Sequence, residues 1–211
     1  WRITEDLIAL FQASHQPPAV FLSGSAIGFY GDHGDFDITE RDIATNIDFA
    51  STLCKQWESI AQQARPFTRV VNLRTGIVLE PSGGALAKML PPFKLNLGGR
   101  IGNGRQYMSW IHINDMLDAM AFLLTDSSIE GPVNMVAPIP VTNKQFTHTL
   151  ASVLQRIAIF PVPAFILKCL LGESSSLLLG SQRVKPERLN EASFNFSYPD
   201  LPSALSDLLK K

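Results

Sequence analysis

The spacing of apolar residues in the first half of the chain predicts helices that alternate with short buried strands. Apolar side chains recur at helical spacing over residues 3–13, where Thr4 is placed to cap the helix. Residues 19–22 form a short continuous apolar run, which is typical of a strand buried on both faces. A second helix over 46–64 and a second short strand over 70–73 repeat the pattern. Such alternation implies right-handed crossovers and a doubly wound, mainly parallel sheet.

The middle of the chain carries weaker signals. A short helix over 83–90 is expected to stop at Pro91 and Pro92, since proline removes a helical hydrogen bond. Asn103-Gly104 signals a hairpin turn before a strand over 106–111.

Three further elements follow this turn. Asn114 is expected to cap a helix that runs to residue 124, and residues 133–136 are a candidate strand. Thr142 and Gln145 have the spacing of a capping box, so a helix begins there.

The composition shifts after residue 160 towards short helical segments. The expected elements are helices over 164–171 and 187–191, a strand over 194–196, and a last helix capped by Asp200. We therefore predict two domains. Residues 1–159 form the Rossmann-like α/β domain, and residues 160–211 form a small, mostly helical domain.

Composition narrows the class of protein. The chain has 211 residues, of which 45% are hydrophobic, enough for one well-buried core. Its 18 basic and 19 acidic residues are spread evenly, which argues against nucleic-acid and membrane partners. The apolar runs are shorter than the roughly 20 residues of a membrane span. Cys54 and Cys169 lie in apolar helical patterns, which indicates reduced, buried thiols and a soluble cytoplasmic protein.

The start of the chain also carries information. It begins at Trp1 without the pattern of a secretory leader, so it resembles a cut end.

Serines and glycines crowd the end of the first predicted strand. Residues 23–32 read Ser-Gly-Ser-Ala-Ile-Gly-Phe-Tyr-Gly-Asp, at the strand end where open α/β sheets bind ligands. A ligand-facing loop and a simple glycine-rich connector explain this run equally well. The spacing Gly-x-Ser-x-Gly of a serine hydrolase is not found around Ser23 or Ser25.

Three other groups of residues have the composition of candidate sites. The acidic residues around His33 lack calcium-loop spacing and the histidines are scattered, so we expect a solvated loop and no metal site. The glycine-rich residues 98–105 suit either a phosphate cradle or a hairpin. His112 and Asp115 form either an acid/base pair or a structural helix start, and the structural role is favoured.

Four ordered blocks resemble one family. Residues 23–32 resemble the motif Ser-Gly-Ser-Ala-x-Gly-Tyr-Tyr-Gly-Asp of the NAD-dependent epimerase family proteins, an atypical branch of the extended short-chain dehydrogenases/reductases. Residues 73–79 and 102–116 are similar to two further blocks of that family. Residues 172–175 with 180–189 are similar to its short C-terminal domain of unknown function.

The resemblance implies an NAD(P)-dependent oxidoreductase or epimerase that acts on a small, nucleotide-sugar-like substrate, with NADP(H) preferred to NAD(H). It also implies that an N-terminal segment holding the pyrophosphate site precedes Trp1. The implied catalytic residues are Ser25 and Tyr30, and the implied substrate residues are Arg105 and His112. The implied cofactor-binding residues are Ser23, Gly24, Arg74, Thr75, Gly76 and Val78.

One departure from the wider superfamily affects the chemistry. Typical members carry Tyr-x-x-x-Lys on the helix after the serine loop, where the tyrosine moves the proton that accompanies hydride transfer. Here residues 49–58 contain no tyrosine, and Lys55 lies six residues after Phe49. Either Tyr30 supplies the proton, or the chemistry is not standard carbonyl reduction. The alternative function is a catalytically silent NADP(H)-binding sensor or interaction module. The expected partner is a small-molecule substrate, and the expected assembly, where one forms, is a homodimer.

Overall fold

A three-stranded parallel sheet lies at the centre of the protein. The computed structural model describes residues 1–44, 48–165, 169, 172 and 179–210. Strands β1 (Val20–Ala26), β3 (Arg69–Thr75) and β7 (Gly131–Met135) pair in parallel in the order β1-β3-β7. Both predicted early strands are therefore present, and the mainly parallel sheet is confirmed.

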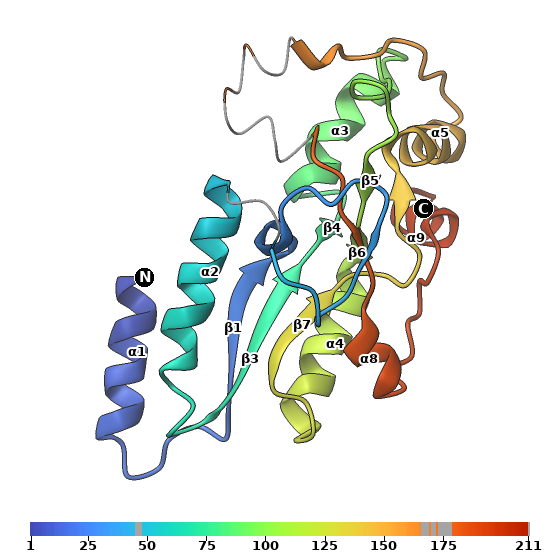
Figure 1. Ribbon diagram of the computed structural model, residues 1–211. Helices are drawn as coiled ribbons and strands as arrows, with labels where there is room; N and C mark the ends of the chain where they lie inside the picture. Colours follow the sequence, from blue (N-terminus) through green and yellow to red (C-terminus); the bar gives the residue numbers. More distant parts are fainter. Residues whose placement is uncertain (45–47, 166–168, 170–171, 173–178, 211) are drawn as a thin grey trace.

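Helices cover both faces of this sheet (Figure 1). Helices α1 (Arg2–Ala13) and α2 (Phe49–Gln62) pack on the face that carries Val70, and α4 (Ile113–Thr125) packs on the face that carries Val71. Successive residues of a strand point to opposite faces, so one apolar run supplies both cores. This is the doubly wound arrangement that the pattern predicts.

Three further strand pairs surround the sheet. Strand β4 (Ile77–Leu79) pairs in parallel with β6 (Trp110–His112), and β2 (Asp37–Ile38) pairs in parallel with β9 (Arg183–Val184). Strand β5 (Tyr107–Met108) pairs antiparallel with β8 (Val141–Thr142). The predicted hairpin at Asn103-Gly104 is therefore wrong. A turn does form there, closed by the Gly104 N–H on the Ile101 carbonyl at 3.0 Å, but the partner of β5 lies far along the chain.

Helix α3 (Gly84–Lys94) continues through Pro91 and Pro92, where we expected it to end. Both prolines lie on the exposed side of the helix, and Phe93 is buried in the largest core together with Trp110. A proline inside a helix costs about 3 kcal/mol. Burial of a phenylalanine offsets much of that cost, so the core extends the helix past its sequence signal.

Helix caps decide where the other helices begin. In α5 (Asn143–Val153) the Gln145 N–H donates to Thr142 Oγ1 at 3.2 Å, and the Thr142 N–H donates to Gln145 Oε1 at 2.8 Å. The predicted capping box is confirmed. The predicted cap of α9 (Leu201–Leu209) is also confirmed, because Asp200 Oδ1 accepts from the Ser203 N–H at 2.9 Å.

Two predicted caps are wrong. Helix α1 begins after Trp1 without a side-chain cap, so Thr4 lies inside the helix. Helix α4 begins after His112, whose Nδ1 accepts from the Asn114 N–H at 3.1 Å. A strand-end histidine therefore takes the capping role that we assigned to Asn114.

The C-terminal segment shares its cores with the rest of the chain. Helix α9 packs on α5, and α8 (Glu187–Glu191) starts after Pro186 as expected. The predicted strand over 194–196 is not formed. Instead, Phe194 and Phe196 pack edge to face at 4.9 Å, and Phe122 of α4 packs against Phe194, so aromatic packing replaces strand pairing.

Three further predictions concern the helix over 164–171, the two cysteines and the absence of membrane spans. Most of the predicted helix over 164–171 lies outside the described residues. Cys54 is buried as expected, but Cys169 is exposed. Among the described residues, no helix has both the length and the apolar character required to cross a membrane.

Candidate functional site

The carboxyl ends of β1 and β3 bring most of the predicted site residues together. Along β1, Ser23 and Ser25 point towards α2, whereas Gly24 lies on the opposite face. The chain then turns into the short 3-10 helix η1 (Ile27–Tyr30), which packs against α2 beyond the strand ends (Figure 1). The serine run is therefore held in a fixed conformation by two elements.

A buried ion pair lies behind this strand end. Arg74 of β3 forms two parallel bonds with Glu58 of α2, from Nε to Oε1 and from Nη2 to Oε2, each 2.8 Å long. The side chains are only 5% and 10% exposed. Ser25 Oγ donates to the same Glu58 Oε1 at 2.7 Å. Bidentate geometry with a third hydrogen bond is the arrangement that compensates buried charges.

Tyr30 extends this network and is fully buried. Its hydroxyl donates to Asn134 Oδ1 at 2.7 Å and accepts from Arg74 Nη1 at 2.9 Å. The Arg74 guanidinium also stacks over the Phe29 ring at 3.5 Å. Burial raises the pKa of Tyr30 to about 12, although Arg74 and Asn134 act in the opposite direction. The hydroxyl is thus occupied and strongly protonated, which does not favour proton transfer, and the assignment of Tyr30 as an acid stays a prediction.

Glu40 ties the same region to the C-terminal segment. Its carboxylate accepts from the backbone N–H groups of Asn134, Glu187 and Arg188 at 2.9, 3.1 and 3.4 Å. Burial raises the pKa of Glu40, and the backbone donors oppose that rise. One carboxylate therefore holds β7 against the start of α8.

Sequence reasoning missed Glu40, Glu58 and Asn134. The available signal was weak: Glu58 lies four residues after the buried Cys54 on the inner side of α2, and Asn134 interrupts an apolar strand. A polar residue on a face that must be buried needs a partner. The partners come from distant parts of the chain and were not visible in the pattern.

The predicted cofactor-binding residues differ in how much space surrounds them. Gly24 is exposed, and a Cβ placed there would meet no atom within 4 Å. A Cβ on Gly76 would lie 2.6 Å from the Ser109 carbonyl oxygen and 2.7 Å from Val136, so this glycine is required for packing. Thr75 is half-buried at the end of β3, and Val78 is half-buried in the middle of β4. The open strip at Gly24 therefore fits the close approach of a flat ring to the strand backbone.

The two predicted substrate residues lie elsewhere. Arg105 is exposed on the turn before β5, where its N–H donates to Asn103 Oδ1 at 2.9 Å. His112 is 1% exposed, stacks on Tyr198 at 3.8 Å and places Nε2 3.3 Å from Asp207 Oδ2. Burial lowers the pKa of His112, and Asp207 and Asp115 oppose this. These contacts give His112 a packing role between β6 and α9.

Asp115 and the acidic loop also serve structural contacts. The Asp115 carboxylate accepts from the N–H groups of Ser197 and Tyr198, at 2.9 and 3.0 Å, and does not bond His112. Asp32 Oδ1 accepts from the Ser181 N–H, and Asp37 pairs with Arg183. Within the described parts of the chain, no group of three or more His, Cys, Asp or Glu residues is arranged to hold a metal ion.

A comparison with known sequences identifies the family. An epimerase family protein of Staphylococcus aureus is 38% identical over 209 residues, which cover 99% of this chain and 70% of that protein. The chain belongs to the epimerase family proteins. A domain of unknown function, DUF1731, matches residues 162–208 of this family member.

Comparison with solved structures shows which fold the chain has. The human epimerase family protein SDR39U1 (isoform 2), solved with NADPH, superposes with a TM-score of 0.95 at 32% identity over 99% of this chain and 71% of that chain. A nucleoside-diphosphate sugar epimerase from Corynebacterium glutamicum superposes with a TM-score of 0.78 at 33% identity over 98% of this chain and 40% of that one. The Rossmann-like fold of the epimerase family is thereby confirmed.

Proposed function

We propose that this epimerase family protein is an NADP(H)-dependent oxidoreductase or epimerase that acts on a small, nucleotide-sugar-like substrate. The observation that carries the proposal is the likeness, over 99% of the chain, to a human family member solved with NADPH. The relative from C. glutamicum, which is named a nucleoside-diphosphate sugar epimerase, supports the substrate class.

The open strip at Gly24 is the place where the nicotinamide ring would lie in this proposal. When bound, the cofactor supplies or accepts hydride. Gly24 leaves room for the ring, and Thr75 of the neighbouring strand β3 lies on the same face of the sheet. The exposed Arg105 is the residue that we propose to bind a phosphate of the substrate, because a guanidinium matches phosphate geometry.

The buried network has a positioning role in the same proposal. Glu58 and Arg74 lock Ser25 and Tyr30 behind the strand end, so the backbone that faces the cofactor is held in one conformation. A rigid backbone at this edge costs no ordering free energy when the ligand binds.

A second function is favoured by two observations. Tyr30 is buried and its pKa is raised to about 12, and the helix α2 lacks a tyrosine. A chain without a proton donor at the site would bind NADP(H) and not turn it over. It would then serve as a sensor of the NADP(H) redox state or as an interaction module.

Calorimetric titration with NADPH and NADH tests the cofactor assignment. The 211-residue chain is compared with a chain extended at its N-terminus by the corresponding segment of a relative, which in this proposal carries the pyrophosphate site. We expect the extended chain to bind NADPH more tightly than NADH. Absence of binding by both chains would remove the cofactor from the proposal.

Gly24→Val provides the matched variant. A valine side chain fits the open space and a β-strand, so unfolding should be unchanged, whereas the ring position would be filled and NADPH affinity lost. Gly24→Ala should reduce the affinity less. Equal affinity of the three proteins would show that the cofactor lies elsewhere.

Turnover separates the two functions. A screen of nucleotide-linked sugars with the extended chain should show NADPH consumption or epimerisation if the protein is an enzyme. Tight NADPH binding without turnover of any of these substrates supports the silent sensor. Tyr30→Phe should abolish turnover and spare binding if Tyr30 is the acid.

A further inference from the structure

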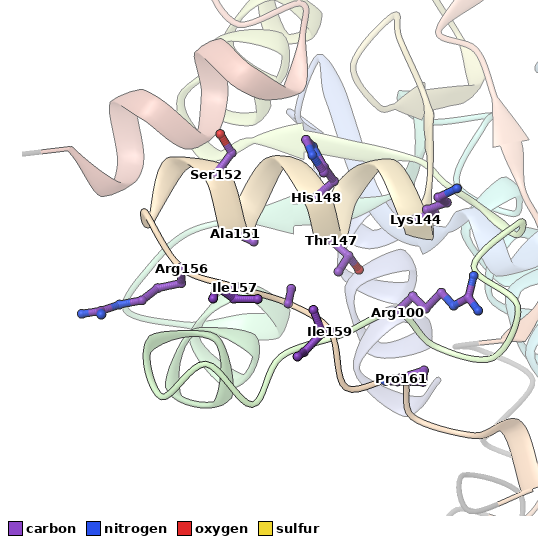
Figure 2. A pocket seen from close by; sticks show the side chains of 11 residues that line it. Arg100, Lys144, Thr147, His148, Ala151, Ser152, Arg156, Ile157, Ile159 and Pro161 are labelled. Atoms are coloured by element: carbon purple, nitrogen blue, oxygen red, sulfur yellow. The ribbon is translucent and has the colours of Figure 1, made fainter.

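A groove of about 550 Å³ lies between α5 and the segment that follows it, away from the ends of β1 and β3. Figure 2 shows Thr147 and Ala151 pointing from α5 towards the chain around Ile157 and Ile159, whereas His148 and Ser152 point to the other side of the helix. This volume is within the range of small-molecule sites, about 300–1,000 Å³. The carboxyl-edge residues described above do not line it.

The walls of the groove are built by hydrogen bonds. The Phe160 N–H donates to the Gly98 carbonyl at 3.3 Å, and the Val162 N–H donates to the Arg100 carbonyl at 2.9 Å. Asn96 Oδ1 accepts from the Ile157 N–H at 3.0 Å. Three bonds thus fasten one wall to the 96–100 segment, and the groove is formed before any ligand arrives.

One end of the groove is basic. The Cβ atoms of Arg100 and Lys144 both lie beside Gly104, at 3.3 and 3.2 Å from the position that a Cβ would take there. In Figure 2 both side chains extend at the same end, and Arg156 extends away at the opposite end. Among the described residues that line the groove, none is acidic. Two neighbouring cations without a counter-charge repel each other, and an anion between them relieves that repulsion.

A threonine faces the same end. Thr147 lies on α5, lines the groove and is 5% exposed as a whole residue. Figure 2 shows the side chain pointing into the groove on the side of Arg100. A threonine hydroxyl that faces a groove can donate a hydrogen bond to a ligand oxygen.

The rest of the groove is apolar. Ile157 and Ile159 are 60% and 67% exposed, and Ala151 forms the opposite wall on α5. Large aliphatic side chains held in water at the edge of a cavity gain free energy when an apolar group covers them. The groove therefore combines an anion-binding end with an apolar body.

We propose that this groove binds a small amphipathic anion, a phosphate monoester that carries an apolar body. Arg100 and Lys144 neutralise the phosphate, the Thr147 hydroxyl bonds one phosphate oxygen, and the apolar body packs between Ala151, Ile157 and Ile159. The site is separate from the carboxyl edge and does not depend on the proposed cofactor.

Calorimetric titration with 1-naphthyl phosphate, 1-naphthol and inorganic phosphate tests the site. We expect 1-naphthyl phosphate to bind more tightly than either half alone, because both ends of the groove contribute. Undetectable binding of 1-naphthyl phosphate would overturn the proposal. So would equal affinity for inorganic phosphate, since the apolar end would then contribute nothing.

Variants assign the two ends. Lys144→Gln and Thr147→Val should each weaken 1-naphthyl phosphate roughly tenfold, as expected for a lost charge-assisted hydrogen bond, and leave 1-naphthol unchanged. Ile159→Ser should weaken both compounds. Lys88→Gln, at an exposed lysine of α3 outside the groove, is the matched control and should change neither.

Two results would contradict this assignment. Equal effects of Lys144→Gln and Lys88→Gln would mean that only overall charge matters. Loss of NADPH affinity in Thr147→Val would place the groove within the cofactor site. Thr147→Val keeps the shape of the side chain, and Lys144→Gln removes the charge from a flexible side chain at the groove edge. Thermal unfolding of each variant checks that the fold is retained.

Discussion

Arg74 and Glu58 form a bidentate ion pair in the interior, with Nη2 2.8 Å from Oε2, and this pair joins α2 to the central strand of the sheet. The free energy that it contributes depends on both partners being present, because a single buried charge has no compensation. The residues that meet it, Ser25 and Tyr30, lie in the family motif.

Breaking the pair should destabilise the protein strongly. We expect Glu58→Gln to lower the free energy of unfolding by about 3–5 kcal/mol, since Arg74 would remain charged and buried. Urea unfolding monitored by circular dichroism measures this. The matched control is Glu130→Gln, because Arg65 and Glu130 pair at 2.7 Å with both side chains 58% exposed. The control should cost less than about 1 kcal/mol. Equal costs would show that burial does not govern the pair.

The hydroxyl of Tyr30 should contribute to stability and to its pH dependence. Tyr30→Phe leaves Asn134 Oδ1 and Arg74 Nη1 without this partner, which should cost about 1–3 kcal/mol at neutral pH. The folded pKa of about 12 lies above the usual value of 10.0. The contribution of the protonated group is therefore fully present below pH 10 and is lost as the pH rises towards 12. The free energies of unfolding of the unchanged protein and of Tyr30→Phe should converge as the pH rises. A difference that stays constant with pH would contradict this.

His112 should make the protein less stable in acid. Its folded pKa is lowered from 6.5 by burial, so the unfolded chain binds the proton more tightly. The stability that the neutral His112 side chain contributes is fully present above pH 6.5, and it is lost as the pH falls through the lowered folded pKa. His112→Gln should flatten this part of the stability curve, whereas His15→Gln, at an exposed site in a loop, should leave it unchanged. Identical curves for the two variants would remove His112 as the cause.

Two glycines should respond differently to alanine. A Cβ at Gly76 would lie 2.6 Å from the Ser109 carbonyl oxygen, so Gly76→Ala should cost about 1–3 kcal/mol through overpacking. Gly24→Ala meets no atom within 4 Å and should leave the free energy of unfolding unchanged or slightly raised. Thermal unfolding of the two variants compares them directly. A destabilised Gly24→Ala would mean that the strip beside β1 is not open.

Part of the candidate site was predictable from the sequence. The motif of residues 23–32 placed the serines and Tyr30 at a strand end. The structure joins Ser25 to Arg74 through Glu58, and Tyr30 bonds Arg74 directly. The roles of these residues in catalysis and cofactor binding stay predictions. Glu58, Glu40 and Asn134 were not predicted, because the cost of burying them is offset by partners between 16 and 148 residues away.

The sequence by itself determined the local elements of this protein. Helical spacing, continuous apolar runs and the caps at Thr142 and Asp200 act between neighbours in the chain, so they can be read without the fold. Only the tertiary structure decided that β5 pairs with β8, that α3 continues through Pro91 and Pro92, and that His112 packs on Tyr198. Each of these outcomes depends on burial against residues that are distant in sequence, and that free energy outweighs the local preference.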